Sequence, residues 1–390
     1  MRLTTLDKTV ASTIAVCIGL LLLFVGRSAQ SARMAAVSDV AAVREEAALR
    51  QPRVVYSAID ADGFEQLFLL PLDLAGDEPF AGEARQITNM PLGIWDFTVS
   101  PVEPTIYFSA LKEDGTSDLW RYGVDTEAPT LVLSCADAAC TDPAVSPDGS
   151  LIAFTRRTAH PFSSPMTSPP RLQLLTPADG AAYPLFADSQ KLGLEPSWSG
   201  DGQWLSSVSP DPPGVGAYQL ETGEEAFFPS RSGEGGAWRP GALQLAISDI
   251  DQGDDTFVTQ IERFDLGDDE QVALSEHDFP VEDTGPVWSP DGAWLALRRK
   301  ELAGPGQSLS KQIWRMRADG SDAAPLTQDI DPDAEIDYGL PSWSPDGRYL
   351  VYHRFPLRGP DITISVWLMD VETGEQRLLV EPGQRPLWVQ

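Results

Sequence analysis

The residues best suited to chemistry are acids that alternate along one segment. Carboxylates stand at every second position, at Asp329, Asp331, Asp333 and Glu335. Calcium takes about six to eight oxygen ligands, and alternating acids in a loop can supply several of them. The pattern therefore predicts a calcium site, with a solvated acidic loop as the alternative, because the spacing does not match a complete EF-hand. A second acidic cluster, at 249–255, has the same two interpretations.

Patterns typical of catalysis are weaker. The histidines His160, His277 and His353 show no spacing that indicates a pair of metal ligands. No Gly-x-Ser-x-Gly sequence is present, so a serine-hydrolase site of that kind is not predicted. No residue is therefore assigned a catalytic role, and a binding protein is the favoured class over an enzyme.

The elements that must position these residues are set by a repeated phrase. Trp-Ser-Pro-Asp-Gly occurs at 288–292 and 343–347, with related forms around Val99, Val145, Trp198 and Trp238. Pro, Asp and Gly favour a tight turn, so each copy predicts a hairpin between a strand that ends in Trp or Val and a second strand. A third and a fourth strand follow, and four strands in about 40 to 50 residues are typical of a β-propeller blade.

These phrases resemble the WD-like repeats of TolB-type β-propellers, in which the Trp-Ser-Pro-Asp-Gly turn precedes Ile-Ala-Phe-like and Ile-Trp-like strands. The resemblance covers about residues 53–390 and implies an all-β propeller. It does not specify a function, because such propellers serve as scaffolds, receptors and enzyme domains. Some polysaccharide lyases with similar blades hold a metal through histidines. A carbohydrate-active lyase or hydrolase, or a ligand-binding propeller with a divalent metal, is therefore the alternative function.

The two ends of the repeat predict how the propeller closes. Residues 53–58 read as a second strand with no first strand before them, whereas 386–389 read as a first strand with nothing after it. We expect the last residues to pair into the first blade, because an unpaired strand would leave an open edge. Counting first strands predicts seven blades. Six, the number implied by the TolB resemblance, is the alternative.

The N-terminal end predicts a membrane anchor. After a short flank at 1–9, residues 10–26 are almost wholly apolar, which is a length between a signal-peptide core and a full span. We expect an uncleaved transmembrane helix, with a cleaved signal sequence as the alternative. A helical stalk is predicted for 27–52, and the propeller domain for 53–390.

Charge and cysteine content indicate a compartment and exclude one class of partner. A net charge of −30 disfavours binding to nucleic-acid phosphates. Cys135 and Cys140 are five residues apart and are expected to form a disulfide, with two free thiols as the alternative. Disulfides persist in oxidising compartments, so a location outside the cytoplasm, periplasmic or extracellular, is predicted.

One face of the propeller is predicted to carry the longer loops. Basic residues follow the second strands there, at Arg156, Arg157, Arg299, Lys300, Arg354 and Arg358. Loops on a rigid scaffold are common binding sites, so we interpret these basic residues as a partner-binding face. Mutual pairing with the acidic connections between blades is the alternative. The resulting hypothesis is a membrane-tethered propeller that acts as a non-catalytic protein-interaction scaffold or accessory subunit of an envelope or membrane complex.

Overall fold

The computed structural model describes most of the chain beyond residue 51. The described residues are 52–74, 80–159, 168–252, 257–268, 270–275, 280–304, 307–328, 335–358 and 362–389. They form strands and no helix, and so none of them belongs to a helix that could cross a membrane. The predicted anchor at 10–26 lies outside the described residues, as does the predicted stalk at 27–52 except for Pro52.

The Trp-Ser-Pro-Asp-Gly phrase forms a hairpin turn because its own side chains bind the turn's backbone. In the copy at 288–292, Trp294 N donates to Ser289 Oγ (2.9 Å) and Ala293 N donates to Asp291 Oδ1 (3.0 Å). Gly292 takes a φ of 67°, in the left-handed region that glycine enters at little cost. The predicted hairpin is therefore present, and each residue of the phrase has a role in it.

The first sheet joins the two ends of residues 52–389. Its strands are β30 (Gln384–Val389), β1 (Arg53–Ile59), β2 (Glu65–Asp73), β3 (Phe80–Ala81) and β4 (Arg85–Gln86). The pairing of β30 with β1 is antiparallel, with Val389 opposite Arg53 and Trp388 opposite Val54. The prediction that the C-terminal strand completes the first blade is therefore confirmed.

Two antiparallel runs follow and share one eight-stranded sheet. The first run is β5 (Ile94–Val99), β6 (Thr105–Leu111), β7 (Ser117–Gly123) and β8 (Pro129–Leu133). The second is β9 (Ala138–Val145), β10 (Ile152–Thr158), β11 (Arg171–Thr176) and β12 (Ala181–Pro184). A single parallel pair, Ser117 with Ala139, links the two runs.

The next run is a separate four-stranded sheet, and two further runs form a second eight-stranded sheet. The separate run is β13 (Leu194–Trp198), β14 (Trp204–Pro210), β15 (Pro213–Gln219) and β16 (Glu225–Pro229). The linked runs are β17 (Ala237–Trp238), β18 (Gln244–Gln252), β19 (Phe257–Asp265) and β20 (Glu270–Ala273), then β21 (Val281–Trp288), β22 (Trp294–Glu301), β23 (Gln312–Arg317) and β24 (Ala324–Pro325). The parallel pair of Thr259 with Glu282 connects them.

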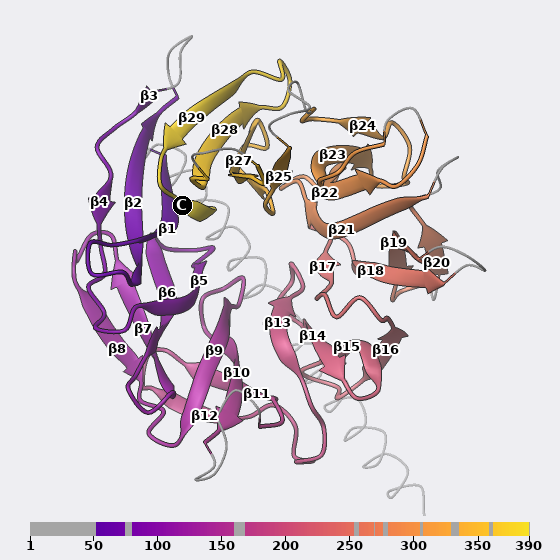
Figure 1. The fold of residues 1–390 in the computed structure, drawn as a ribbon. Coiled ribbons are helices and arrows are strands. Elements are labelled where there is room, and N and C mark those ends of the chain that lie inside the picture. Colours follow the sequence, from indigo (N-terminus) through magenta and orange to yellow (C-terminus); the bar gives the residue numbers. More distant parts are fainter. Residues whose placement is uncertain are drawn as a thin grey trace, which may run out of the picture. The chain divides into compact units, whose positions relative to one another are not determined.

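The last run contacts the first sheet. Its strands are β25 (Ile336–Tyr338), β26 (Ser342–Trp343), β27 (Tyr349–Pro356), β28 (Ser365–Asp370) and β29 (Gln376–Val380). The first strands of successive runs contact one another in chain order, from β5 through β9, β13, β17, β21 and β26 to β30, and β30 contacts β5. Figure 1 shows the runs of residues 52–389 following one another around a common centre.

The repeated tryptophans tie each first strand to the one before it. Trp288 Nε1 donates to the carbonyl of Ala237 (3.0 Å), and Trp343 Nε1 donates to that of Val287 (3.1 Å). Trp388 continues the series with a bond to the carbonyl of Ser342 (3.0 Å). These side chains are buried, so the tryptophans hold neighbouring runs together and are not surface platforms.

The core is divided between neighbouring sheets, because strands such as β1 are buried on both faces. Val54 and Tyr56 pack against β27 and β28, whereas Val55 packs against residues of β6 and β7. Successive side chains of a strand point to opposite faces. A strand covered on both faces therefore reads as a continuous apolar run.

Several predicted loops are shorter than expected because the second strands continue through charged residues. Arg156, Arg157, Lys300 and Arg354 were expected in loops but lie in β10, β22 and β27. The connection between β14 and β15 is also short, at residues 211–212. Alternation of buried and exposed positions, rather than the first charged residue, decides where these strands end.

Candidate functional site

A β-bulge recurs in five of the first strands, at or beside the position three residues before the Trp or Val that precedes the turn phrase. We call the residues at this position the bulge ring: Asp96, Asp142, Glu195, Gly235, Gly285, Leu340 and Arg385. The strand register shifts at or beside this position in β5, β9, β13, β21 and β30. A bulge places two residues opposite one and re-aims a side chain.

Three charged members of the bulge ring adopt a backbone conformation that such residues rarely use. Asp142, Glu195 and Arg385 have φ values of 53°, 52° and 50°. Positive φ costs energy in residues with a Cβ, and such residues cluster where a side chain must be held in one place. The bulge ring is therefore our candidate functional site, and these conformations are the first reason.

Neighbouring acids of the bulge ring interact directly. The backbone N–H of Asp142 donates to Asp96 Oδ2 (2.6 Å), while Asp96 Oδ1 is buried and has no hydrogen-bond partner. Burial, and then the charge of Asp142, raises the pKa of Asp96 to about 8. Burial also raises the pKa of Glu195, with smaller contributions from the charges of Asp142 and Glu234. We call Asp96, Asp142 and Glu195 the acidic arc.

Glu234 connects the acidic arc to the opposite sector. Its Oε2 accepts hydrogen bonds from Gly285 N (2.9 Å) and Ser248 Oγ (2.9 Å), and its Oε1 lies 3.9 Å from Arg298 Nη2. Lys311 Nζ donates to Thr284 Oγ1 (3.0 Å). Burial, followed by the charge of Arg298, lowers the pKa of Lys311.

Arg385 links β30 to β5. Its Nη2 donates to Glu65 Oε1 (2.6 Å), its Nη1 donates to the carbonyl of Trp95 (3.1 Å), and its backbone N–H donates to His353 Nδ1 (3.3 Å). Hydrogen bonds of these residues thus join β5 to β9, Glu234 to β21, and β30 to β5. The sector that includes Arg298, Lys311 and Arg385 is called the basic sector below.

His353 of β27 lies with its ring against Arg385 and Gly339. Burial, and then the charge of Arg298, lowers its pKa to about 4, so the ring is neutral at physiological pH. Its Nδ1 is already used by Arg385, and its Cε1 lies so close to Gly339 that a Cβ there would come within 1.9 Å. His160 and His277 lie outside the described residues. Among the described residues, no three His, Cys, Asp or Glu side chains are grouped to bind a metal ion.

The prediction that Arg299 belongs to an exposed binding face is wrong. Its side chain is 1% exposed, and its Nε and Nη2 donate to the two carboxylate oxygens of Asp283 at 2.7 and 2.6 Å. The guanidinium also lies 4.6 Å from the ring centre of Trp314. Arg299 shares the inner face of β22 with Leu295 and Leu297, because every second residue of a strand points the same way.

The other basic residues of the predicted face have mixed surroundings. Arg156 pairs with Asp137 (2.7 Å), and Arg358 pairs with Glu335 (2.7 Å). Arg354 stacks over the ring of Trp367 (4.3 Å). For Arg156 and Arg358 these contacts fit the alternative of mutual pairing with acidic connections. A role of Arg156, Arg157, Lys300, Arg354 and Arg358 in partner binding stays a prediction.

The predicted calcium site also stays a prediction. Asp329, Asp331 and Asp333 lie outside the described residues. The carboxylate of Glu335, the fourth member, is 11% exposed and is held by Arg358. Calcium could use Glu335 only if that ion pair were given up.

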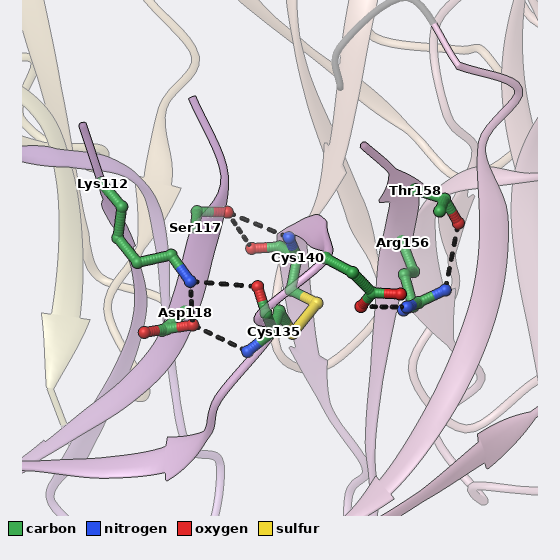
Figure 2. The surroundings of a disulfide bond; sticks show 8 residues. Lys112, Ser117, Asp118, Cys135, Cys140, Arg156 and Thr158 are labelled. Atoms are coloured by element: carbon green, nitrogen blue, oxygen red, sulfur yellow. Dashed lines mark hydrogen bonds and ion pairs between the residues drawn. A yellow bond between two sulfur atoms is a disulfide. The ribbon is translucent and has the colours of Figure 1, made fainter. Parts of the chain in front are cut away.

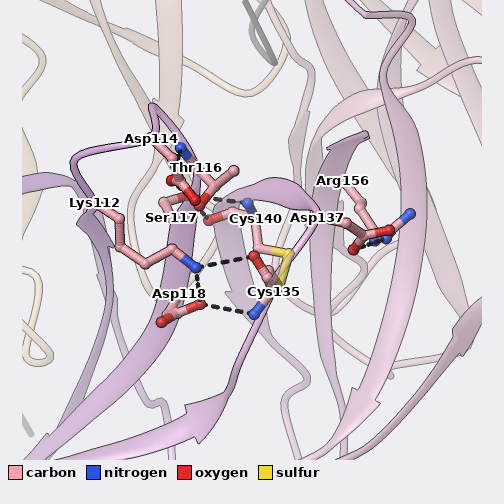
Figure 3. Close-up of polar contacts among 9 residues, drawn as sticks. All are labelled: Lys112, Asp114, Thr116, Ser117, Asp118, Cys135, Asp137, Cys140 and Arg156. Atoms are coloured by element: carbon pink, nitrogen blue, oxygen red, sulfur yellow. Dashed lines mark hydrogen bonds and ion pairs between the residues drawn. A yellow bond between two sulfur atoms is a disulfide. The ribbon is translucent and has the colours of Figure 1, made fainter. Parts of the chain in front are cut away.

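Cys135 and Cys140 are joined in a disulfide that anchors the connection between β8 and β9 (Figure 2). Asp118 Oδ1 accepts from Cys135 N (2.7 Å), and Lys112 Nζ donates to the carbonyl of Cys135 (3.0 Å). Ser117 Oγ donates to the carbonyl of Cys140 (2.8 Å). Figure 3 shows these bonds on one side of the disulfide and the Arg156 to Asp137 ion pair on the other. The connection is therefore held by Lys112, which follows β6, and by side chains of β7 and β10, as well as by sulfur.

Two surface grooves lie elsewhere, along the outer strands. One, of about 880 Å³, is lined by residues that include Arg53, Arg85 and Asp125, and the other, of about 640 Å³, by residues that include Asp60 and Asn89. The ion pair of Arg85 with Glu127 (3.3 Å) closes part of the first groove but is itself exposed. Neither groove is lined by a buried charged side chain, so the bulge ring is the stronger candidate.

Comparisons with known proteins bear on the fold. No protein-family model matches this sequence, and no curated protein is similar enough to match it. Among solved structures, the β-propeller domain of the Trilobed protease from Pyrococcus furiosus matches 85% of this chain and 95% of its own, at 10% identity and a TM-score of 0.56. The chain folds as a β-propeller. An oligogalacturonate lyase in complex with manganese matches this propeller over 84% of each chain, at 12% identity and a TM-score of 0.55.

TolB from Acinetobacter baumannii also matches the propeller, at 16% identity and a TM-score of 0.49. The match covers 87% of this chain and spans 66% of that TolB chain, which is less than two thirds. The all-β propeller implied by the repeat phrases is confirmed as a fold by the structures matched at TM-scores of 0.56 and 0.55. At these identities the likenesses carry no assignment of activity.

The acidic arc should make the stability of the propeller depend on pH. Because the pKa of Asp96 is raised in the folded state, unfolding releases its proton at neutral pH, and stability falls as pH rises from about 4 to about 8. Asp96→Asn keeps an acceptor for Asp142 N–H and removes the titration. We expect this variant to raise Tm more at about pH 8 than at about pH 5.

Thermal melts at the two pH values measure this effect. Glu224→Gln, which removes an exposed carboxylate in the turn between β15 and β16, is the matched control and should shift Tm alike at both. An equal loss of stability for Asp96→Asn at both pH values would contradict a protonated, buried Asp96.

Proposed function

We propose that residues 52–389 form a seven-bladed propeller that is a non-catalytic binding module for a protein partner. The seven antiparallel runs, each with one first strand, support the count, as does the closed order of contacts from β5 to β30 and back. The six-bladed alternative would require one of these runs to lie outside the ring.

The observation that carries this proposal is that acidic and basic side chains lie in separate sectors at and beside the bulge ring. The acidic arc comes from β5, β9 and β13, whereas the basic sector comes from β22, β30 and the residue before β23. Opposed charges in fixed positions give an interface orientation and specificity. Trp95 and Leu340 add exposed apolar surface at 47% and 48% of their areas, and aromatic and Arg side chains often dominate binding energy.

The location and anchoring belong to the same proposal. The disulfide of Cys135 with Cys140 supports a compartment outside the cytoplasm, because thiols are kept reduced inside it. The apolar run at 10–26 would tether the propeller to a membrane. The partner is then a protein of a membrane or envelope complex.

Recovery of a partner from native membranes tests the proposal. Chemical crosslinking of the full chain, followed by affinity purification, should recover one protein in fixed proportion. Trp95→Ala should weaken its recovery, because Trp95 is exposed beside the acidic arc, while Glu224→Gln should leave it unchanged. A monomeric chain that cleaves a polysaccharide, and loses that activity on chelation, would replace this proposal with the lyase alternative.

A further inference from the structure

Among the described residues, the acidic arc lacks the opposite charge that accompanies Arg385 of the bulge ring and the nearby Arg298. Arg385 is paired with Glu65, and Arg298 lies beside Glu234. Among the described residues, by contrast, no basic side chain forms an ion pair with Asp96, Asp142 or Glu195. Carboxylates brought together without a cation repel one another, which costs energy that a bound cationic group would recover.

Buried polar atoms without partners point to the same place. Ser109 lies on β6 directly opposite the bulge of β5, because Phe108 faces Phe97 and Ala110 faces Ile94. Its side chain is 0% exposed, and its Oγ, like Asp96 Oδ1, makes no hydrogen bond. The Ser109 side chain lies next to the Asp96 carboxyl. A native protein seldom leaves such atoms unsatisfied unless something else completes them.

We propose that Asp96, Asp142 and Glu195 form a binding site for a primary ammonium group carried by the protein partner. An ammonium group has three N–H donors and no acceptor, and so it suits acceptors that converge from several strands. Trp95, the residue before Asp96, supplies an exposed aromatic surface, and such surfaces attract cations. The inference rests on the proposed function, since it names the group by which the partner is recognised.

Asp96 couples this site to pH. The groups that face it are Asp142 from β9 and Ser109 from β6; Arg385 from β30 reaches the neighbouring Trp95 carbonyl and is held by Glu65. With a pKa of about 8, Asp96 keeps its proton at neutral pH and becomes a carboxylate above it. A lysine ammonium stays charged to about pH 10. Affinity for the ammonium group should therefore rise as pH increases through about 8.

Calorimetric titration of the full chain with acetylated, amidated trilysine tests the site. We expect Asp142→Asn and Glu195→Gln each to raise Kd about tenfold at about pH 9, because each loses a charge-assisted hydrogen bond. Glu224→Gln removes the same charge from an exposed turn and should change Kd less than about twofold. This control is needed because a chain of net charge −30 attracts any cationic peptide.

Peptide variants define the chemical group. A trialanine amide with a free N-terminus tests an α-amino group, and acetylated triarginine amide tests a guanidinium; binding of triarginine equal to that of trilysine would overturn the choice of a primary ammonium. Equal losses for Asp142→Asn and Glu224→Gln would overturn the site itself. Circular dichroism melts establish that both variants are folded.

The outcomes separate this inference from the proposed function. If crosslinking recovers a partner that Asp142→Asn binds with unchanged affinity, the protein-binding function stands and the ammonium site falls. If trilysine binding depends on Asp142 and Glu195 but no partner is recovered, the site stands and the protein-binding function falls.

Discussion

Removal of residues 384–390 should lower the free energy of unfolding by at least about 5 kcal/mol, the largest effect expected in this chain. The deletion removes β30, whose backbone pairs with β1 and whose Trp388 is only 6% exposed. Loss of a buried Trp side chain alone costs about 3 to 5 kcal/mol, and the unpaired backbone of β1 adds to it. Urea denaturation of the two proteins measures the difference.

Two single substitutions separate closure from the loss of any tryptophan. Trp388→Ala removes a buried side chain and its bond to Ser342, and should cost about 3 to 5 kcal/mol. Trp95→Ala, at a side chain that is 47% exposed, should cost less than about 1 kcal/mol. If deletion of residues 384–390 left stability unchanged, the ring would not depend on β30 and the closure argument would fail.

Asp283→Asn should lower the free energy of unfolding by about 3 to 5 kcal/mol, because it leaves the charge of Arg299 buried without a partner. Both side chains are almost completely buried, and Arg299 Nη1 already has no hydrogen-bond partner. A double variant, Asp283→Leu with Arg299→Met, is the comparison. It removes both charges and should recover most of the loss, since a buried ion pair can often be replaced by apolar side chains.

An exposed pair provides the control for the buried one. Lys191 and Glu225 also form an ion pair, but their side chains are 38% and 51% exposed. Glu225→Gln should therefore change stability by no more than about 1 kcal/mol. Similar losses for Asp283→Asn and Glu225→Gln would show that burial of the Arg299 pair has little energetic consequence. Urea denaturation at neutral pH measures both variants.

The strands and their closure could be predicted because the signals for them are local. Ser289 and Asp291 bind the backbone of the turn in which they lie, so the phrase itself indicates a hairpin. The incomplete repeat at 386–389 predicted the pairing of β30 with β1, because it has a first strand and no second strand of its own. Trp288 and Trp343, which end first strands, are buried.

The ends of the second strands are harder to predict, because charged residues are typical of loops. Arg299 continues the inward-facing series of Leu295 and Leu297, and its charge is tolerated there only because Asp283 of β21 lies beside it. That partner is 16 residues away in the chain. No local pattern distinguishes a buried, paired Arg from an exposed one.

The bulge ring went unrecognised for a related reason, although a sequence signal for it exists. Charged residues or glycines stand three positions before Trp or Val in most repeats, as in Glu195-Pro-Ser-Trp and Arg385-Pro-Leu-Trp. Aligning the repeats on this position, instead of on the turn phrase alone, would have singled it out. What no alignment of repeats supplies is the proximity of Asp96 to Asp142, 46 residues apart.

By itself, the sequence determined the repeating strands, the turns between them and the strand that joins the two ends. The strands and turns depend on residues that are neighbours in the chain and on apolar alternation along it, and the incomplete repeats at the two ends indicate the closure. Only the tertiary structure decided that Arg299 is buried with Asp283 and that Asp96, Asp142 and Glu195 form an acidic arc. Such groupings depend on strand register, on bulges and on the order of strands around the centre, which bring together side chains that are distant in sequence.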